Sequence, residues 1–349
     1  MTDLETIAAA LERLPRGGVA VLCTLMRVAG SAYRGAGARM LVLPDDTTVG
    51  AVSGGCLEKD LVAHAAKVRA SGAATHVVYD LTADDDAPWG LNMGCRARLD
   101  LLLEPHTPGD PPGWLAAALE ATRTREPLVI ATVFQSPEGT ASPGTRLLAY
   151  GDGRLEGSIA GELGDALRVD ALRVLREERS DAVEHTVAGA AAAALVEYLA
   201  PPVAVLACGD GQDAAILVRL ATALGWHGRQ VRLDEPLGTL DERTAAVIMT
   251  HHYGRDRALL ATLLRSHARY VGVLGPRART TQLLADLTAE GAAPNPAQQL
   301  RLAAPVGLDI GAETPDEVAL AILAEVRAVL SGRSGGRLRE RTGPIHDRR

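Results

Sequence analysis

The first 200 residues contain the same series of patterns twice: short apolar runs, followed by a stretch with apolar residues at helical spacing. Apolar side chains at every third or fourth position indicate a helix, and short runs bounded by turn residues indicate strands. In the first copy these patterns predict strands at 21–25, 39–42 and 50–54 and a helix over 57–68. Matching segments follow at 129–133, 146–149 and 157–161, the last two at an offset of 107 residues. The repeat predicts one domain made of two copies of an α/β unit.

Proline and glycine divide the chain further. A cluster from Pro108 to Gly113 separates the two copies, and Pro201-Pro202 follows a segment, Asp181 to Leu199, for which we predict a helix. We therefore expect a duplicated α/β domain over 1–200 (copies at about 17–105 and 125–200), a second domain over 201–332 and a flexible basic tail over 333–349.

After this boundary, buried strands alternate with helical patterns. The continuous apolar run at 203–207 is typical of a buried parallel strand, and further strands are predicted at 230–233, 245–249 and 270–274. Such alternation predicts a C-terminal Rossmann-like domain with a parallel sheet. A last helix is predicted to begin at a capping box of Thr314 and Glu317, with Pro315 at its first position.

Composition and charge exclude several classes of function. A net charge of −7 and a single Phe give neither a basic surface nor a stacking platform for nucleic acid. The acidic N-terminus lacks the features of a signal peptide, and the longest apolar run, Ala188 to Val196, is far shorter than the ~20 residues that span a bilayer. Four cysteines without a CxxC pair fit a reducing compartment. We expect a cytoplasmic protein without nucleic-acid or membrane partners.

The segment Ser53-Gly54-Gly55-Cys56 places a cysteine at the start of the helix predicted over 57–68. Backbone N–H groups at a helix N-terminus attract anions and favour the thiolate form. Paired glycines let a ligand approach the backbone, because no Cβ stands in the way. Cys56 is therefore a candidate nucleophile, sulfur carrier or metal ligand, and the alternative is a small buried side chain. The second copy has Glu162-Leu163 where the first has Gly55-Cys56, so we expect this chemistry in the first copy only.

Glycines also follow the first strand of the second domain. Gly209, Gly211 and Ala214 form a GxGxxA turn between a strand and a helix, and Asp234 follows Gly211 by 23 residues, as a ribose-binding acid does in dinucleotide folds. These four residues are the candidate nucleotide site. The alternative is that the turn serves only close packing of the helix.

An ordered series of motifs along nearly the whole chain resembles the xanthine dehydrogenase accessory factor family, also called the XdhC/CoxI family. In the first domain the motifs are Gly30-Ser31-Ala32-Tyr33-Arg34, Gly37-Ala38-Arg39-Met40, Ser53-Gly54-Gly55-Cys56-Leu57-Glu58, and Met93-Gly94-Cys95 leading into Leu103-Glu104-Pro105. In the second they are Met249-Thr250-His251, Val271-Gly272-Val273-Leu274-Gly275 and the segment from Gly307 to Pro315.

The resemblance implies a function as well as a fold. Members of that family are understood to bind molybdenum cofactor, to protect it during sulfuration by a cysteine desulfurase, and to hand it to a molybdenum hydroxylase. By resemblance, this chain is a maturation factor rather than a turnover enzyme. Its transient ligand is then molybdenum cofactor (molybdopterin), its partners are the hydroxylase client and the desulfurase, and we expect a homo-oligomer.

The resemblance also assigns residues. Cys56 and Cys95 match the family's cysteine motifs, with Cys56 as a possible ligand of the cofactor's molybdenum and a packed core thiol as the alternative for Cys95. Arg34 and Arg39 flank a loop of small residues and are candidates to hold the cofactor's phosphate. Arg39 has a counterpart, Arg146, in the second copy, which favours a structural role instead. The two remaining cysteines are expected in the core.

Two other functions compete with this interpretation. The first is an NAD(P)-binding oxidoreductase that uses the Rossmann-like domain, although the sequence shows no evident acid or base for hydride transfer. The second is a nucleotide-sensing interaction protein that carries no cofactor.

Overall fold

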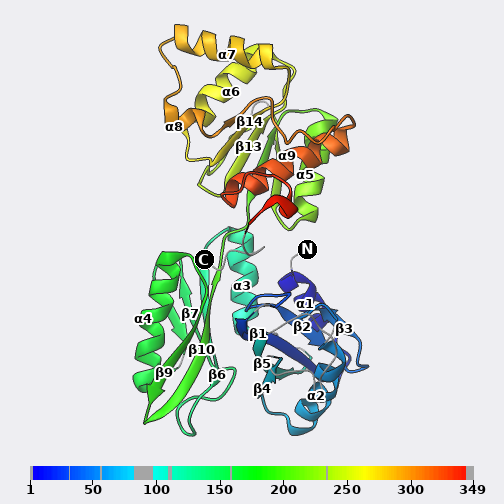
Figure 1. Cartoon of the computed structure of the whole chain (residues 1–349), viewed down its shortest axis with the longest axis vertical. Coiled ribbons are helices and arrows are strands. Elements are labelled where there is room, and N and C mark those ends of the chain that lie inside the picture. The colour runs from blue at the N-terminus through cyan, green and yellow to red at the C-terminus, as the bar shows by residue number, and fades with distance from the viewer. Residues whose placement is uncertain are drawn as a thin grey trace. The chain divides into compact units, whose positions relative to one another are not determined.

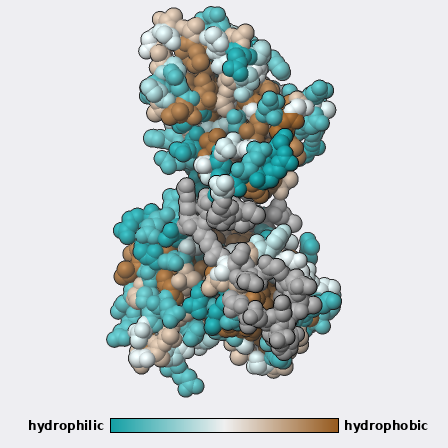
Figure 2. All heavy atoms as spheres, viewed as in Figure 1, coloured by the Kyte–Doolittle hydropathy of each residue, from teal (hydrophilic) through white to brown (hydrophobic). Residues whose placement is uncertain are grey.

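The computed structural model describes residues 3–30, 32–55, 57–81, 97–108, 112–157, 159–232 and 235–342. The chain divides into two compact units, Thr2–Pro201 and Pro202–Arg349. No helix in the described part of the chain is long and apolar enough to cross a membrane. On the face drawn in Figure 2, hydrophilic side chains predominate and hydrophobic ones form separate patches, because most large apolar side chains lie in buried clusters.

The described residues of the first copy form a five-stranded antiparallel sheet with two helices (Figure 1). Its strand order is β3-β2-β1-β5-β4. The elements are α1 (Asp3–Glu12), β1 (Ala20–Gly30), β2 (Arg39–Val42), β3 (Thr48–Gly50), α2 (Glu58–Ser71), β4 (Thr75–Asp80) and β5 (Ala97–His106).

The second copy repeats this topology, and its strand order is β8-β7-β6-β10-β9. The elements are α3 (Gly113–Thr124), β6 (Leu128–Gln135), β7 (Arg146–Tyr150), β8 (Leu155–Gly157), α4 (Gly161–Glu177), β9 (Asp181–Val187) and β10 (Ala190–Leu199). The predicted duplication is confirmed. Each copy also includes the helix before its first strand, so the repeated unit is longer than the sequence pattern indicates.

The predicted helix from Asp181 to Leu199 is wrong. This segment is the β9–β10 hairpin, which turns at Ala188 and Gly189 with φ values of 51° and 79°. Alanine has a high intrinsic helix propensity, but β10 pairs with β6 on one side and β9 on the other. The buried run Ala192–Val196 packs between layers on both faces of the sheet, so tertiary contacts override local preference.

The N-terminal unit is built in layers. One face of the first sheet packs against α2, and one face of the second packs against α4. The opposite faces pack against α1 and α3, which share one hydrophobic cluster that includes Leu22 and Ile130. Near Phe134 and Met26 the two sheets contact each other directly. The two copies therefore share a core.

Two reciprocal ion pairs join the copies across this shared core. Arg39 on β2 donates to both carboxylate oxygens of Glu197 on β10, and Arg146 on β7 donates to both oxygens of Glu104 on β5. The four side chains are at most 14% exposed. Both guanidinium groups lie over the indole of Trp114, 5.1 and 4.7 Å from its ring centroid. Each copy thus supplies the cation for the other copy's carboxylate.

Glycine is required where the chain passes these carboxylates. A Cβ on Gly37 would lie 2.5 Å from Glu197 Oε1, and one on Gly144 would lie 2.7 Å from Glu104 Oε1. Both glycines also have a φ of 90°, which residues with a side chain rarely adopt. The equivalence of the copies therefore extends to individual backbone positions.

Asp100 on β5 centres a further contact between the copies. It is 1% exposed, accepts a hydrogen bond from Arg27 Nε at 2.9 Å and contacts His76 Nε2 at 2.9 Å. Arg27 also donates to Glu184 and lies over the ring of Phe134, both in the second copy. Burial by itself raises the pKa of Asp100, but the hydrogen bonds from His76 and Arg27 outweigh it and lower this pKa from 3.8 to about 2.

The C-terminal unit is a five-stranded parallel sheet with the order β12-β11-β13-β14-β15. Its strands are β11 (Ala204–Cys208), β12 (His227–Val231), β13 (Thr244–Ile248), β14 (Tyr270–Val273) and β15 (Leu302–Ala303). Its helices are α5 (Gln212–Ala223), α6 (Tyr253–Arg265), α7 (Arg277–Ala289), α8 (Pro296–Gln299) and α9 (Pro315–Leu330), with a short 3-10 turn, η1 (Leu338–Glu340).

Helices cover both faces of this sheet, as expected for a doubly wound fold. Val247 points to the face covered by α5 and α9, and its neighbour Ile248 points to the face covered by α6 and α7. The predicted capping box at the start of α9 is present: Thr314 accepts from the N–H of Glu317, whose side chain accepts from the N–H of Thr314. The predicted Rossmann-like parallel-sheet domain is confirmed.

We expect Arg39→Met to destabilise the protein by about 3–5 kcal/mol, because it leaves the Glu197 carboxylate buried without its cation. The double variant Arg39→Met, Glu197→Leu should recover most of this loss, since it removes both charges. As a control, Arg123→Met breaks an exposed pair with Glu120 and should cost less than about 1 kcal/mol. Unfolding free energies from urea denaturation measure all three, and equal costs at positions 39 and 123 would contradict the expectation.

Asp100 should make stability depend on acid pH. Its folded pKa of about 2 lies below the ordinary 3.8, so its contribution is complete above about pH 4 and is lost as pH falls toward 2. In Asp100→Asn this component is absent, and the plot of unfolding free energy against pH should be flatter than in the wild type over this range. Urea denaturation at a series of pH values tests this, and parallel curves would refute it.

Candidate functional site

The candidate turn of the first copy lies between β3 and α2. Ser53 is 7% exposed, and its Oγ accepts hydrogen bonds from the N–H groups of Gly55 and Leu57 at 3.2 and 3.3 Å. Glu58 Oε2 accepts from Ser53 Oγ at 2.6 Å and from Leu57 N at 3.1 Å, and its Oε1 accepts from Ser53 N at 3.1 Å. The N–H groups of Gly55 and Leu57 therefore bond to these two side chains instead of standing free at the helix start.

The loop after β1 lies beside this turn. A Cβ on Gly54 would be 3.7 Å from the ring of Tyr33, and Tyr33 itself is 71% exposed. Arg34 is near the surface, where its guanidinium donates to Asp3 at 2.6 Å. Arg39, in contrast, is buried against Glu197. The structure thus brings Tyr33 to the candidate turn and gives the two predicted arginines different surroundings.

The two copies differ at the turn by one residue. Val52 and Ile159 are buried before it, and Leu57 and Leu163 are buried after it. The next buried helix positions keep the same spacing from these leucines: Leu61, Ala65 and Val68 in α2, and Leu167, Ala171 and Val174 in α4. Four residues, Ser53–Cys56, therefore stand where the second copy has three, Ala160–Glu162. This register pairs Leu163 with Leu57, which corrects the pairing of Leu163 with Cys56 made from the sequence.

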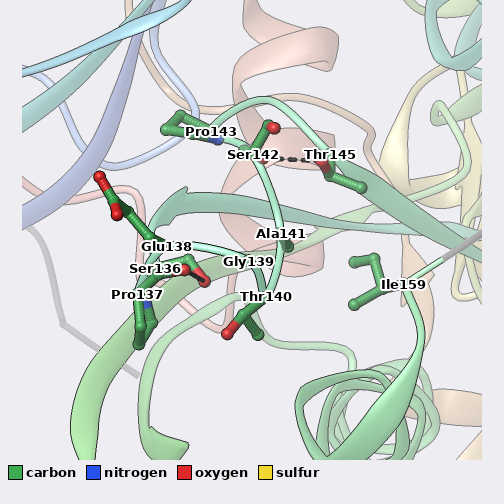
Figure 3. A pocket seen from close by; sticks show the side chains of 10 residues that line it. All are labelled: Ser136, Pro137, Glu138, Gly139, Thr140, Ala141, Ser142, Pro143, Thr145 and Ile159. Carbon is green, nitrogen blue, oxygen red and sulfur yellow. Dashed lines mark hydrogen bonds between the residues drawn. The ribbon is translucent and has the colours of Figure 1, made fainter. Parts of the chain in front are cut away.

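In the second copy, the loop between β6 and β7 forms an open pocket of about 580 Å³ (Figure 3). At the offset of 107 residues, this loop corresponds to residues 29–38 of the first copy, which include Tyr33 and Arg34. Among the described residues that line the pocket, Glu138 is the one charged side chain and none is a cation. The lining residues are Ser136–Pro143, Thr145 and Ile159.

The cysteines fall into two groups. Cys23 and Cys208 are buried, as predicted, and burial raises the pKa of each thiol from 9.0 to about 12. Cys56 and Cys95 lie outside the described residues. Among the residues that the structure describes, no group of three or more His, Cys, Asp or Glu side chains could hold a metal ion.

The glycine turn of the C-terminal unit joins β11 to α5. A Cβ on Gly209 would lie 2.6 Å from the carbonyl oxygen of Met249, so packing alone requires this glycine. A Cβ on Gly211 would have no heavy atom of the described residues within 4 Å. Gln230 Nε2 donates to the carbonyl oxygens of both glycines, and Ala214 is buried. Packing therefore explains two of the predicted nucleotide-binding residues but not Gly211; Asp234 lies outside the described part, and nucleotide binding stays a prediction.

The sequence did not reveal a polar cluster at the ends of β13 and β14. Asp256, on α6, is fully buried, and it accepts hydrogen bonds from Arg279 Nε at 3.0 Å and from Thr250 Oγ1. Thr250 in turn accepts from the N–H of His252. A charged residue in the first turn of a helix is usually solvated, so periodicity gives no sign of this burial. The available signal is the polar segment that begins with Thr250 directly after a buried strand.

Comparison with known families decides where this chain belongs. The model described as "XdhC and CoxI family" matches residues 14–80 and 121–187, and the model described as "XdhC Rossmann domain" matches 205–326. Together these matches take in more than half of the chain. The chain belongs to the XdhC and CoxI family. The first of these models matches equivalent parts of the two copies, in agreement with the duplicated sheets.

Two curated relatives in this family are similar along most of their length. A Bacillus subtilis (strain 168) protein, named as one of the subunits of a "probable xanthine dehydrogenase", is 26% identical over 330 residues, which cover 88% of this chain and 92% of the relative. "Molybdenum cofactor insertion chaperone PaoD" of Escherichia coli (strain K12) is 25% identical over 323 residues, which cover 92% of this chain and 86% of the relative.

A solved structure has the same architecture. The crystal structure of a xanthine dehydrogenase from Bacillus halodurans superposes with a TM-score of 0.71 at 25% sequence identity, covering 96% of this chain and 97% of the other. The fold of this XdhC and CoxI family member is thus shared along almost its whole length.

Cys23 and Cys208 should resist alkylation in the native protein. At pH 8 a thiol with a pKa of about 12 is a thiolate in only about one molecule in ten thousand, and the thiolate is the reactive form. After treatment with iodoacetamide at pH 8, mass spectrometry should find both cysteines unmodified in folded protein and modified in guanidinium. Modification of either one in folded protein at the rate of a free thiol would contradict the assignment.

Proposed function

We propose that this chain is a chaperone that binds molybdenum cofactor, protects it during sulfuration by a cysteine desulfurase and delivers it to a molybdenum hydroxylase. One observation carries the proposal: the turn that contains Cys56 has one more residue than its counterpart and is tied by side chains that the counterpart lacks. Family membership and the relative named as a molybdenum cofactor insertion chaperone support this cargo. The relative named as part of a xanthine dehydrogenase supports a client of that type.

Each predicted residue of the turn has a role in this proposal. Cys56 contacts the molybdenum of the cargo or carries the incoming sulfur, and Cys95 provides a second sulfur. Thiolates are soft ligands and suit a metal centre whose sulfur is exchanged. The main chain at Ser53, Gly54 and Gly55 receives the cargo closely, because the two glycines have no side chain.

The surroundings of the two arginines favour Arg34 as the phosphate ligand. The side chains of Arg34 and Asp3 are 36% and 58% exposed, so water screens their ion pair and Arg34 can exchange the carboxylate for a phosphate. Arg39 already donates to Glu197 and to the carbonyl oxygen of Gly37 inside the shared core. We therefore assign Arg39 a structural role in the core that the two copies share, rather than a role in phosphate binding. The described lining of the second copy's pocket includes no cation, so it offers no counterpart of Arg34 for a phosphate.

The C-terminal domain has room for a second ligand. The open space at Gly211 lies at the carboxyl end of β11, the edge at which doubly wound sheets bind nucleotides. This observation favours a nucleotide such as NAD(P) as a regulatory ligand of that domain. It adds to the cofactor-carrying role and does not replace it.

Molybdenum retention tests the proposed function. The full-length protein is purified from a host that makes molybdenum cofactor, and molybdenum and pterin per chain are measured by mass spectrometry. We expect both in the wild type and at least about tenfold less in Cys56→Ala, because a thiolate ligand worth about 1.4 kcal/mol or more is lost.

Cys208→Ala serves as the matched control, because it removes a buried thiol from the other unit, and it should retain wild-type amounts. Equal molybdenum in the wild type and Cys56→Ala would refute the role of this cysteine.

A further inference from the structure

We infer that Ser53 and Glu58 are positioning residues that hold the main chain at Gly55 and Leu57, the sequence neighbours of Cys56, in place for the cargo. This inference rests on the proposed function of Cys56. We call the two side chains and their mutual hydrogen bonds the Ser53–Glu58 lock.

The lock fixes the main chain on both sides of Cys56. Ser53 Oγ accepts from the N–H of Gly55, which precedes Cys56 in the sequence, and from the N–H of Leu57, which follows it. Glu58 connects the same groups a second time, because it accepts hydrogen bonds from the hydroxyl and the N–H of Ser53 and from the N–H of Leu57. Gly55 has a φ of 106°, a conformation that a residue with a side chain rarely adopts. Movement of the turn therefore breaks several hydrogen bonds at once.

The second copy provides an internal control, because it builds the same fold without a lock. Ala160 stands in the place of Ser53 and has no hydroxyl. The buried register places Gly164 opposite Glu58, and a Cβ there would collide with the carbonyl oxygen of Ile159. In that copy the helix α4 simply begins at Gly161. The lock is therefore not needed to fold a copy; it accompanies the additional residue of the Cys56 segment.

The additional residue explains why polar side chains are needed here. Residues 161–163 are helical in the second copy, whereas Ser53–Gly55 and Leu57 in the first copy lie outside the helix α2. Leu57 is buried, and a buried N–H group without an acceptor costs free energy. Ser53 and Glu58 supply acceptors for the N–H of Leu57, and Ser53 also accepts from the N–H of the more exposed Gly55.

Four variants test the inference in the full chain. Ser53→Ala removes an acceptor without a change of charge, Ser53→Thr keeps the hydroxyl, and Glu58→Gln removes the carboxylate. Glu162→Gln is the matched control, because Glu162 is an exposed acid in the first turn of α4. Two quantities are measured: molybdenum and pterin per chain, and hydrogen exchange at the amides of Gly55 and Leu57.

We expect Ser53→Ala and Glu58→Gln each to lower molybdenum retention at least about fivefold. Ser53→Ala should accelerate exchange at the amides of Gly55 and Leu57, and Glu58→Gln at the amide of Leu57, the effect of a lost hydrogen bond. Ser53→Thr and Glu162→Gln should keep wild-type retention and exchange. Both effects are local, so the melting temperature should fall by only a few degrees, about 3 °C.

Failure of the inference and of the proposed function give different results. Wild-type retention in Ser53→Ala and Glu58→Gln, beside loss in Cys56→Ala, would overturn the inference alone. Unchanged amide exchange in Ser53→Ala would overturn the lock itself. An equal loss of molybdenum in Glu162→Gln would assign the effect to charge and also overturn it. Equal molybdenum in the wild type and Cys56→Ala would overturn the proposed function and the inference together.

Discussion

The N-terminal unit depends on two buried ion pairs that join its two halves. Arg39 and Arg146 each pair with a carboxylate of the other copy, and both guanidinium groups lie over the indole of Trp114. Removal of these charges from water is costly, and the cost is offset only because both partners of each pair are present and bidentate. Neither sheet can bury its own glutamate without the other sheet. The pairs therefore fix how the two sheets pack and where the loops after β1 and β6 begin.

This common frame makes the differences between the copies informative. Strand order, the glycines beside the buried glutamates and the spacing of apolar helix positions agree between them. Among the described residues, the copies differ at the β3–α2 turn, where the first copy has the Ser53–Glu58 lock, and at the loop beside it, which carries Tyr33 and Arg34. They also differ in the length of chain between their last two strands, which is sixteen residues from β4 to β5 and two from β9 to β10. The proposed roles of Cys56 and Cys95 fall in these parts of the sequence.

The sequence predicts much of this frame but not its pairing. Strands with continuous apolar runs and the box at Thr314 are visible because their signals are local. The β9–β10 hairpin is missed because alanine side chains carry no strong strand preference, and the pairing of β10 with β6 and β9 decides its conformation.

The site is partly predictable for a similar reason. The glycines and Cys56 stand out in the sequence, but the additional residue appears only when burial of Leu57 and Leu163 sets the register. The bond between Arg39 and Glu197 joins positions 158 residues apart, and no local pattern links them.

The crossed arrangement of the arginines also bears on the origin of the protein. In a symmetric homodimer, a residue of one protomer meets the partner of its own counterpart, so every contact occurs twice. Arg39 with Glu197 and Arg146 with Glu104 follow this rule inside one polypeptide. A single-unit ancestor that associated with itself would bury the same charges between its two protomers. Because both units belong to one polypeptide, their sequences need not be identical, so one half can have an additional residue in a single turn while the other half does not.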